Sequence, residues 1–215
     1  MLTRDQAIAE IRAAKSDPER LATLALPDDP DVRRYLFDVC EIDALAQALF
    51  ERTKDKNHWA RFQINTFALG GMVLVSEDMC DWDRTRHEWA LRPGWEGVEI
   101  WEEKTAGKDW AKKHYEAPRK ALEAKESWLG GEIGDEELKE ARKASSCAVN
   151  VFSYTASIFR AAAQAVHYAS AVYPAADYAA YYVSYASVSY AAGRDRWYLD
   201  YLCFLLEACN KELLR

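Results

Sequence analysis

The sequence of 215 residues lacks the short motifs that mark common enzyme classes. It contains no HExxH zinc signature, no GxSxG nucleophile elbow, no Walker phosphate loop and no GxGxxG dinucleotide fingerprint. The glycine pairs at 70–71 and 130–131 are not followed by the Lys-Ser or Lys-Thr that a phosphate loop requires. The sequence therefore predicts a protein that is not an enzyme, with no catalytic residue and no cofactor.

Metal-binding residues are also sparse. The five cysteines are an odd number at scattered positions with no CxxC pair, and the four histidines form no ligand motif. We expect no metal site and no disulfide framework, but reduced thiols in a cytoplasmic protein. One alternative stays open. Asp83 and His87 are four residues apart and would share a helix face, as in a metal-dependent hydrolytic enzyme, although a third ligand is not visible.

A long hydrophobic run is missing too. Residues 144–193 carry only two charged side chains, Arg160 and Asp177, yet most of the others are Ala, Ser and Tyr rather than Leu, Ile, Val or Phe. A membrane-spanning helix needs about 20 predominantly apolar residues. The first residues show no positive segment followed by an apolar stretch. We predict neither a membrane span nor a signal peptide.

Positive charge is in deficit. The chain has 28 Lys and Arg against 35 Asp and Glu, a formal net charge of −7. Direct binding of nucleic acid through its phosphates needs clustered basic residues, so the overall charge argues against it. An acidic surface instead favours a protein partner with a basic surface, such as a toxin, a nuclease or a defence complex.

Helix signals are abundant, and they predict an all-α fold. Thr3 and Gln6 have the spacing of a capping box, and Asp29 followed by Pro30 marks a second helix start. We expect residues 1–75 to form N-terminal helices that pack on the same core as an Ala/Tyr-rich helical region at 118–215. The sequence therefore predicts that these two regions form one compact domain, a helical bundle.

The Ala/Tyr-rich region predicts a long antiparallel helix pair. One helix is expected from Asp135 to Tyr173, where Pro174 ends it, and a second up to Ala192. Small side chains let helices approach closely, while tyrosine fills gaps and keeps a hydroxyl group for hydrogen bonding. Apolar residues cover more of these helices than a small bundle can bury, so a homodimer is a further expectation.

Tryptophans concentrate in residues 76–117, which we predict to be a loop-rich irregular insert because Pro and Gly interrupt it. Trp and Arg are frequent at binding hot spots, and loops on a rigid scaffold often carry function. The alternative is that the tryptophans pack the insert onto the bundle. The expected partner-binding residues are Trp82, Asp83, Arg86, His87, Trp89, Trp95 and Trp101.

A second candidate surface is polar. Arg160, Gln164 and His167 recur at i, i+4 and i+7, and so lie on one face of a helix. They could line a groove for a partner. Alternatively they form a partly solvated or internally hydrogen-bonded stripe, since a buried Arg needs partners.

Residues 117–192 resemble the alanine-rich helical region of immunity proteins from bacterial toxin systems, a region also common in phage proteins. The similarity lies in a Pro-Arg-x-Ala helix start, a Trp-x-x-Gly-Glu-Ile turn and Ala-rich helices dotted with Tyr and Ser. The matching residues are Pro118, Arg119, Ala121, Leu122, Glu123, Ala124, Trp128, Gly131, Glu132, Ile133, Asp135, Glu136, Glu137 and Leu138. Gly134 departs from the usual Ser or Thr.

The resemblance implies an all-helical protein without catalysis that neutralises another protein. With the composition, it leads us to expect a non-catalytic, immunity-type inhibitor of a toxin or nuclease that acts by direct contact. A second hypothesis is a phage-encoded, anti-CRISPR-type inhibitor of a host defence complex, whose acidic surface would block a nucleic-acid site.

Overall fold

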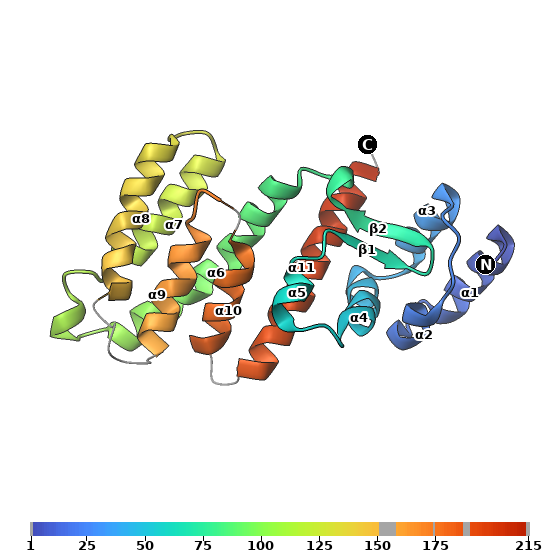
Figure 1. Ribbon diagram of the computed structural model, residues 1–215, viewed down its shortest axis with the longest axis horizontal. Helices are drawn as coiled ribbons and strands as arrows, with labels where there is room; N and C mark the ends of the chain where they lie inside the picture. The colour runs from blue at the N-terminus through green and yellow to red at the C-terminus, as the bar shows by residue number, and fades with distance from the viewer. Residues whose placement is uncertain (1, 151–157, 174, 187–189, 214–215) are drawn as a thin grey trace. The chain divides into compact units, whose positions relative to one another are not determined.

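The fold is known from a computed structural model that describes residues 2–150, 158–173, 175–186 and 190–213 (Figure 1). The structure is 74% helical, and β-structure within the described ranges is limited to one two-stranded sheet. The predicted all-α class is therefore confirmed. No helix within those ranges combines the length and the apolar character needed to cross a membrane.

The chain forms two compact units, where we expected one compact domain. Unit 1 contains residues 1–82 and 198–215, and unit 2 contains residues 83–197. The boundaries that we expected at 75 and 118 do not coincide with this division. The C-terminal residues fold with the N-terminal helices, a long-range association that composition along the chain does not show.

Unit 1 begins with helices whose starts follow the predicted caps. The Thr3 hydroxyl accepts from the Gln6 amide, and the Thr3 amide donates to Gln6 Oε1 at 2.9 Å. The Asp29 carboxylate accepts from the amides of Asp31 and Val32. The helices are α1 (Arg4–Ala14), α2 (Pro18–Thr23), α3 (Pro30–Val39), α4 (Ile42–Thr53) and α5 (His58–Phe62).

A β-hairpin follows α5. Strands β1 (Thr66–Leu69) and β2 (Met72–Ser76) pair antiparallel, and the short helix η1 (Glu77–Met79) comes next. Gly70 turns the chain with φ 62°, and a Cβ there would lie 2.3 Å from the Leu26 amide nitrogen. The turn thus needs glycine both for its conformation and for its close approach to another segment.

The end of helix α11 (Tyr190–Leu213) supplies aromatic side chains to the core of unit 1. The rings of Tyr198 and Tyr201 contact Phe62 with centroids 5.3 and 5.2 Å apart, and the Tyr198 hydroxyl lies 3.1 Å from Thr53 Oγ1. Buried phenols commonly keep such a partner. These contacts explain why residues 198–215 belong to unit 1.

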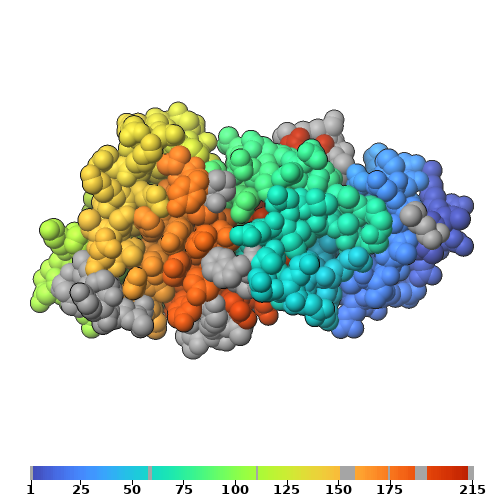
Figure 2. Space-filling model, in the orientation of Figure 1, coloured from blue at the N-terminus to red at the C-terminus, as the bar shows by residue number. Residues whose placement is uncertain are grey.

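Unit 2 consists of helices around an alanine-rich core. After α6 (Trp82–Thr105), whose first residue belongs to unit 1, come the short η2 (Asp109–Ala111) and the helices α7 (Ala117–Leu129), α8 (Asp135–Asn150), α9 (Ile158–Ala169) and α10 (Ala176–Ala186). In the space-filling view, parts of α9 and α10 reach the surface (orange, Figure 2). A cluster of buried alanines from α8, α9 and α10 packs around Trp101.

The irregular insert predicted at 76–117 is wrong, because Trp82–Thr105 form one helix of 24 residues with Pro93 inside it. Its glycines are close-contact positions rather than helix ends. A Cβ on Gly94 would lie 2.6 Å from the Ala169 Cβ, and one on Gly97 would lie 3.0 Å from the Ala162 carbonyl oxygen. Burial against neighbouring helices here outweighs the low helix propensity of Pro and Gly.

The single helix predicted from 135 to 173 is also wrong. Arg142 on α8 lies 2.9 Å from His167 on α9, whereas 25 residues of one continuous helix would separate them by about 37 Å. Helices α8 and α9 therefore pack against each other. Residues 151–157, through which we expected the helix to continue, lie outside the described residues. Helices α9 and α10 form the close Ala/Tyr-rich pair.

Candidate functional site

Most side chains that we expected to hold a partner lie in the core. Trp82 is 8% exposed, His87 is 7% exposed, and Trp89 and Trp101 are fully buried. Trp89 packs edge-to-face on Trp197 at 6.0 Å, and the Trp101 indole donates to the Tyr115 carbonyl at 3.0 Å. These four side chains fill the interior, so the expectation of an exposed tryptophan surface is corrected for them.

The other three expected residues are more accessible but do not form one patch. Asp83 is exposed, and Arg86 and Trp95 are half-buried. Trp95 donates its indole N–H to Glu126 at 2.9 Å. Burial raises the pKa of Asp177, and the positive charge of Arg86 lowers the same pKa by a smaller amount. Trp95 thus interacts with α7 and Arg86 with α10.

His87 belongs to a buried polar cluster that sequence reasoning missed. The His87 Nδ1 lies 3.1 Å from the Nζ of Lys125, a fully buried residue. The same Nζ donates to the Ala171 carbonyl oxygen at 2.7 Å and lies 3.8 Å from the centre of the Trp128 ring. Burial, with the nearby charge of Arg142, lowers the pKa of Lys125 to about 7. No feature of the sequence distinguishes this lysine from its exposed neighbours on α7.

His167, expected in a groove with Arg160 and Gln164, lies instead at the contact of α8 and α9. Arg142 donates to His167 Nε2 at 2.9 Å, and Ser146 Oγ lies 3.0 Å from Nδ1. Because a guanidinium can only donate, Nε2 must accept and the ring is neutral with its proton on Nδ1. Burial and the Arg142 charge accordingly lower the pKa of His167 to about 4.

This neutral histidine should make the protein sensitive to acid. The folded state disfavours the imidazolium, so the unfolded chain binds more protons below the ordinary pKa of 6.5. Between pH 6.5 and 4 we expect the contribution of His167 to lower the free energy of unfolding by no more than about 3 kcal/mol, since solvent screens part of the effect. In urea denaturation, the free energy of unfolding of His167→Gln should decline less over this pH range than that of the wild type, while His114→Gln should follow the wild type. Equal declines in all three proteins would contradict the assignment of a neutral, buried His167.

Arg160 and Gln164 do line a groove, together with side chains that sequence reasoning had treated as scaffold. The hollow has a volume of about 400 Å³ on the α9–α10 pair. We call it the tyrosine groove. Its lining residues are Ile158, Arg160, Ala161, Gln164, Tyr181, Tyr182 and Tyr185.

The rings around the tyrosine groove are ordered by mutual packing. Tyr168 stacks on Tyr178 and Tyr182 with centroids 4.9 and 5.3 Å apart, and the rings of Tyr181 and Tyr185 lie 5.7 Å apart. Tyr185 is nevertheless 56% exposed, and Ile158 and Tyr178 are each 44% exposed. Large apolar side chains gathered on one exposed surface are typical of a contact site.

The electrostatics of the tyrosine groove are set by one cation. No carboxylate is among its lining residues, and Arg160 Nε is buried without a hydrogen-bond partner in the described part of the chain. A buried donor without an acceptor costs about 1–3 kcal/mol. The arrangement can accept a carboxylate or carbonyl oxygen from a bound molecule, and the phenol groups offer further hydrogen bonds.

The residues proposed for a metal site do not come together. Across the described ranges, no group of three or more His, Cys, Asp or Glu side chains is placed to hold a metal ion. His87 is directed to Lys125 in the core, while Asp83 is exposed. The geometry therefore gives no support to a pairing of Asp83 with His87.

Comparison with protein-family models, curated protein sequences and solved structures finds no match to this chain. The resemblance of residues 117–192 to immunity proteins thus remains an expectation from the motifs alone.

Proposed function

We propose that this protein is a non-catalytic binding protein that holds another protein in its tyrosine groove. The observation that carries the proposal is the exposed, tyrosine-lined hollow with Arg160, whose Nε has no hydrogen-bond partner among the described residues. Tyrosine offers a large contact area with few rotatable bonds, so little conformational entropy is lost when a partner binds. Tyr and Arg are also the residue types enriched at hot spots.

The support beneath the groove favours the same function. Helix α9 buries Ala161, Ala162, Ala165 and Val166, and α10 buries Ala179, Ala180 and Val183. Small buried residues hold the two backbones close together and fix where the tyrosines project. Rigid presentation of aromatic side chains lowers the cost of ordering an interface.

The chemistry of the groove indicates what enters it. Because Arg160 is the one charged side chain among the described residues that line the groove, the bound segment should present an acidic side chain or free carbonyl groups beside apolar ones. The basic partner surface expected from the net charge of −7 would then meet the protein outside the groove. The resemblance to immunity proteins favours a partner that is neutralised by this contact.

Site-specific photo-cross-linking tests the proposal directly. A benzophenone amino acid at Tyr185 should capture a partner in cells that make the protein, because the side chain projects from the groove. Tyr173 is the matched control, since it is 54% exposed against 56% for Tyr185 but does not line the groove. Equal capture at both positions, or capture at neither, would argue against the groove.

Affinity for the captured partner provides the second measurement. Reversing the charge with Arg160→Glu should weaken binding about 30-fold, the effect of losing a hot spot worth about 2 kcal/mol. Arg34→Glu makes the same charge change at an exposed position on α3 and should bind like the wild type. If the partner is a toxin, adding the wild-type protein should also inhibit its activity, and Arg160→Glu should not.

A further inference from the structure

The connection between α6 and α7, taken together with the adjoining residues of both helices, has a charge opposite to that of the whole chain. Residues 104–120 contain six Lys and Arg against two Asp and Glu, whereas the net charge of the protein is −7. The helix α6 ends at Thr105, and Gly107 turns the chain with φ 71°. This stretch of unit 2 thus carries a local excess of positive charge.

This connection borders a hollow of about 690 Å³. We call it the lysine pocket. Four lysines line it, namely Lys108, Lys112, Lys113 and Lys120, and Glu116 is the only carboxylate among the lining residues. Ala106, Ala117, Ala141 and Ala144 leave room between them, and Tyr115 adds an aromatic side chain.

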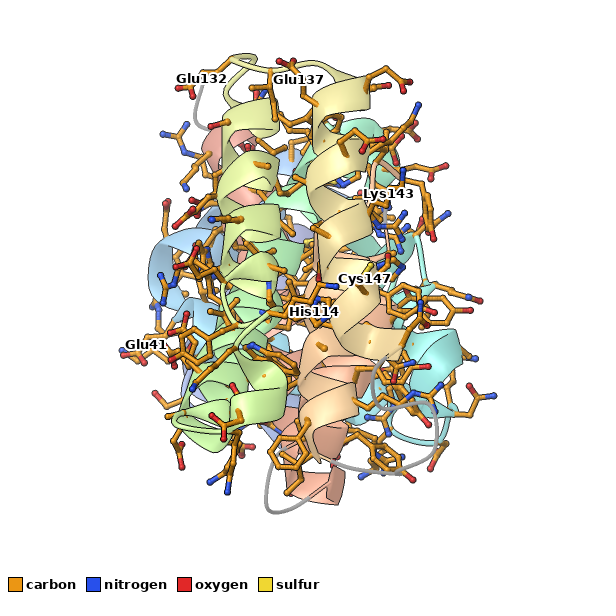
Figure 3. All side chains as sticks on the ribbon, turned by 90° about the vertical axis from the view of Figure 1, so that its left-hand side faces the viewer. Glu41, His114, Glu132, Glu137, Lys143 and Cys147 are labelled. Atoms are coloured by element: carbon orange, nitrogen blue, oxygen red, sulfur yellow. The ribbon has the colours of Figure 1, made fainter. Side chains whose placement is uncertain are left out.

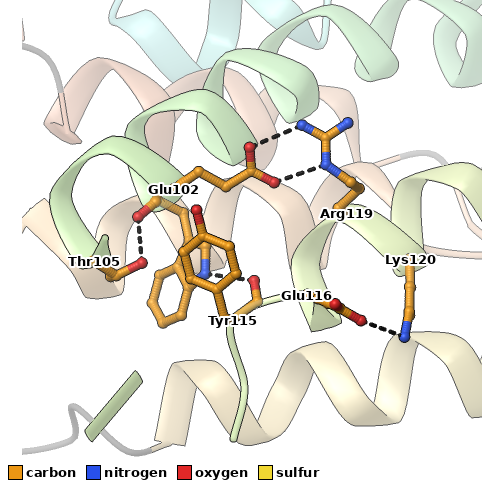
Figure 4. Close-up of polar contacts among 7 residues, drawn as sticks. Glu102, Thr105, Tyr115, Glu116, Arg119 and Lys120 are labelled. Carbon is orange, nitrogen blue, oxygen red and sulfur yellow. Dashed lines mark hydrogen bonds and ion pairs between the residues drawn. The ribbon is translucent and has the colours of Figure 1, made fainter. Parts of the chain in front are cut away.

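The lysines remain available to a ligand. Lys120 pairs with Glu116 at 2.6 Å and Lys112 with Asp109 at 2.6 Å, but every side chain in these two pairs is at least 66% exposed. Exposed ion pairs of this kind contribute only about 0–1 kcal/mol, so a multivalent anion can replace the carboxylates. Figure 4 shows Glu116 and Lys120 together at the start of α7, while Arg119 is held separately by Glu102.

The backbone adds to the positive field. Ala117 is the first residue of α7 and lines the lysine pocket, and no side chain caps this helix at Glu116. The amino end of a helix carries partial positive charge that favours anions. Here this field acts without free amides at the first two positions, because the Ala117 amide donates to the His114 carbonyl oxygen and Pro118 has no N–H. The pocket wall is also fixed in place, because the Trp101 indole donates to the Tyr115 carbonyl oxygen from the core.

We propose that the lysine pocket binds a small molecule with a diphosphate or triphosphate group. Several ammonium groups and a helix amino end suit clustered phosphate charge. A volume of about 690 Å³ lies within the range of small-molecule sites, and Tyr115 and the alanines can contact an apolar part of the ligand. The pocket and the tyrosine groove have no lining residue in common.

A compact anion fits better than a nucleic acid. A nucleic-acid backbone needs a continued basic track, but the other end of the α7–α8 pair is acidic, with Glu132, Asp135, Glu136 and Glu137. Figure 3 shows Glu132 and Glu137 at the turn between the two helices, away from His114 in the connection to α7. The basic residues of the pocket are therefore not continued to that end of the helix pair.

Calorimetric titration of the full-length protein with inorganic pyrophosphate and with ATP tests the site. Both should bind, and the double variant Lys108→Glu/Lys113→Glu should weaken binding about tenfold or more by reversing two lining charges. The control is Lys54→Glu/Lys139→Glu, which makes the same change of charge at exposed positions outside the pocket and should bind within about twofold of the wild type. Circular dichroism should show unchanged helicity in both variants.

Three outcomes would overturn the proposal. One is the absence of measurable binding of either probe to the wild type. Another is an equal loss in both double variants, which would show a general charge effect. The third is tighter binding of single-stranded DNA than of ATP, which would make the surface a nucleic-acid contact. None of these outcomes bears on the cross-linking at Tyr185, so the two proposals fail independently.

Discussion

The free energy of unfolding should rise as the pH increases from 7 toward 9, and Lys125 should cause the rise. This amine is fully buried, and burial with the Arg142 charge lowers its pKa from 10.5 to about 7. Between these two values the unfolded chain carries a proton on Lys125 that the folded protein releases. The contribution of Lys125 to the free energy of unfolding therefore increases with pH throughout this window.

The size of this change in the free energy of unfolding follows from the lowered pKa of Lys125. A pKa displacement from 10.5 to about 7 corresponds to a penalty of about 5 kcal/mol below pH 7, which disappears by pH 10.5. Buried thiols act in the opposite direction at higher pH. Burial raises the pKa of Cys40 to about 11 and the pKa values of Cys203 and Cys209 to about 12. Above pH 9 the unfolded chain therefore loses these thiol protons before the folded protein does, and the free energy of unfolding falls. The wild type should thus be most stable near pH 9.

Urea denaturation at a series of pH values, compared with Lys125→Met, isolates the lysine. The unbranched methionine fills a similar volume and cannot titrate, so the difference between variant and wild type should change by up to about 5 kcal/mol between pH 7 and 10.5. Lys143→Met, at an exposed position on α8, should keep the wild-type profile. A Lys125→Met profile parallel to that of the wild type would contradict the buried, neutral amine.

The helical class could be predicted from the sequence because caps and alanine-rich periodicity act locally. The Thr3 capping box and the Asp29 cap form as expected. The α6 helix was missed because Pro93, Gly94 and Gly97 are local helix breakers, while the tertiary contacts that use them come from distant segments. The expectation at 76–117 thus depended on propensity where packing decides.

The site residues divide in the same way. Periodicity correctly placed Arg160 and Gln164 on one face, but the tyrosines that complete the groove come from α10, across the chain connection. The buried contact of Lys125 with His87 spans 38 residues, and the approach of Cys80 to Cys209 at 3.8 Å spans 129. Such pairs depend on the tertiary fold, and a single sequence contains no local pattern for them.

Trp89 and Trp101, expected at a partner surface, thus lie in the core, whereas Tyr185, expected in the scaffold, is exposed beside the tyrosine groove. Trp101→Ala should lower the free energy of unfolding by about 3–5 kcal/mol, because it empties a large buried site. It also leaves the Tyr115 carbonyl without its indole donor. Tyr185→Ala, at a side chain that is 56% exposed, should change stability by less than about 0.5 kcal/mol.

Measuring stability and binding on the same two variants separates the roles. Urea denaturation should detect Trp101→Ala, and binding of the partner identified by cross-linking should be lost in Tyr185→Ala while its folding is normal. Where Trp101→Ala remains folded, it should bind the partner, because Trp101 does not line the tyrosine groove. The reverse pattern would be a stable Trp101→Ala variant that no longer binds and a Tyr185→Ala variant that binds normally. That result would place recognition on the tryptophans, because a side chain that affects binding without affecting the core must reach the partner.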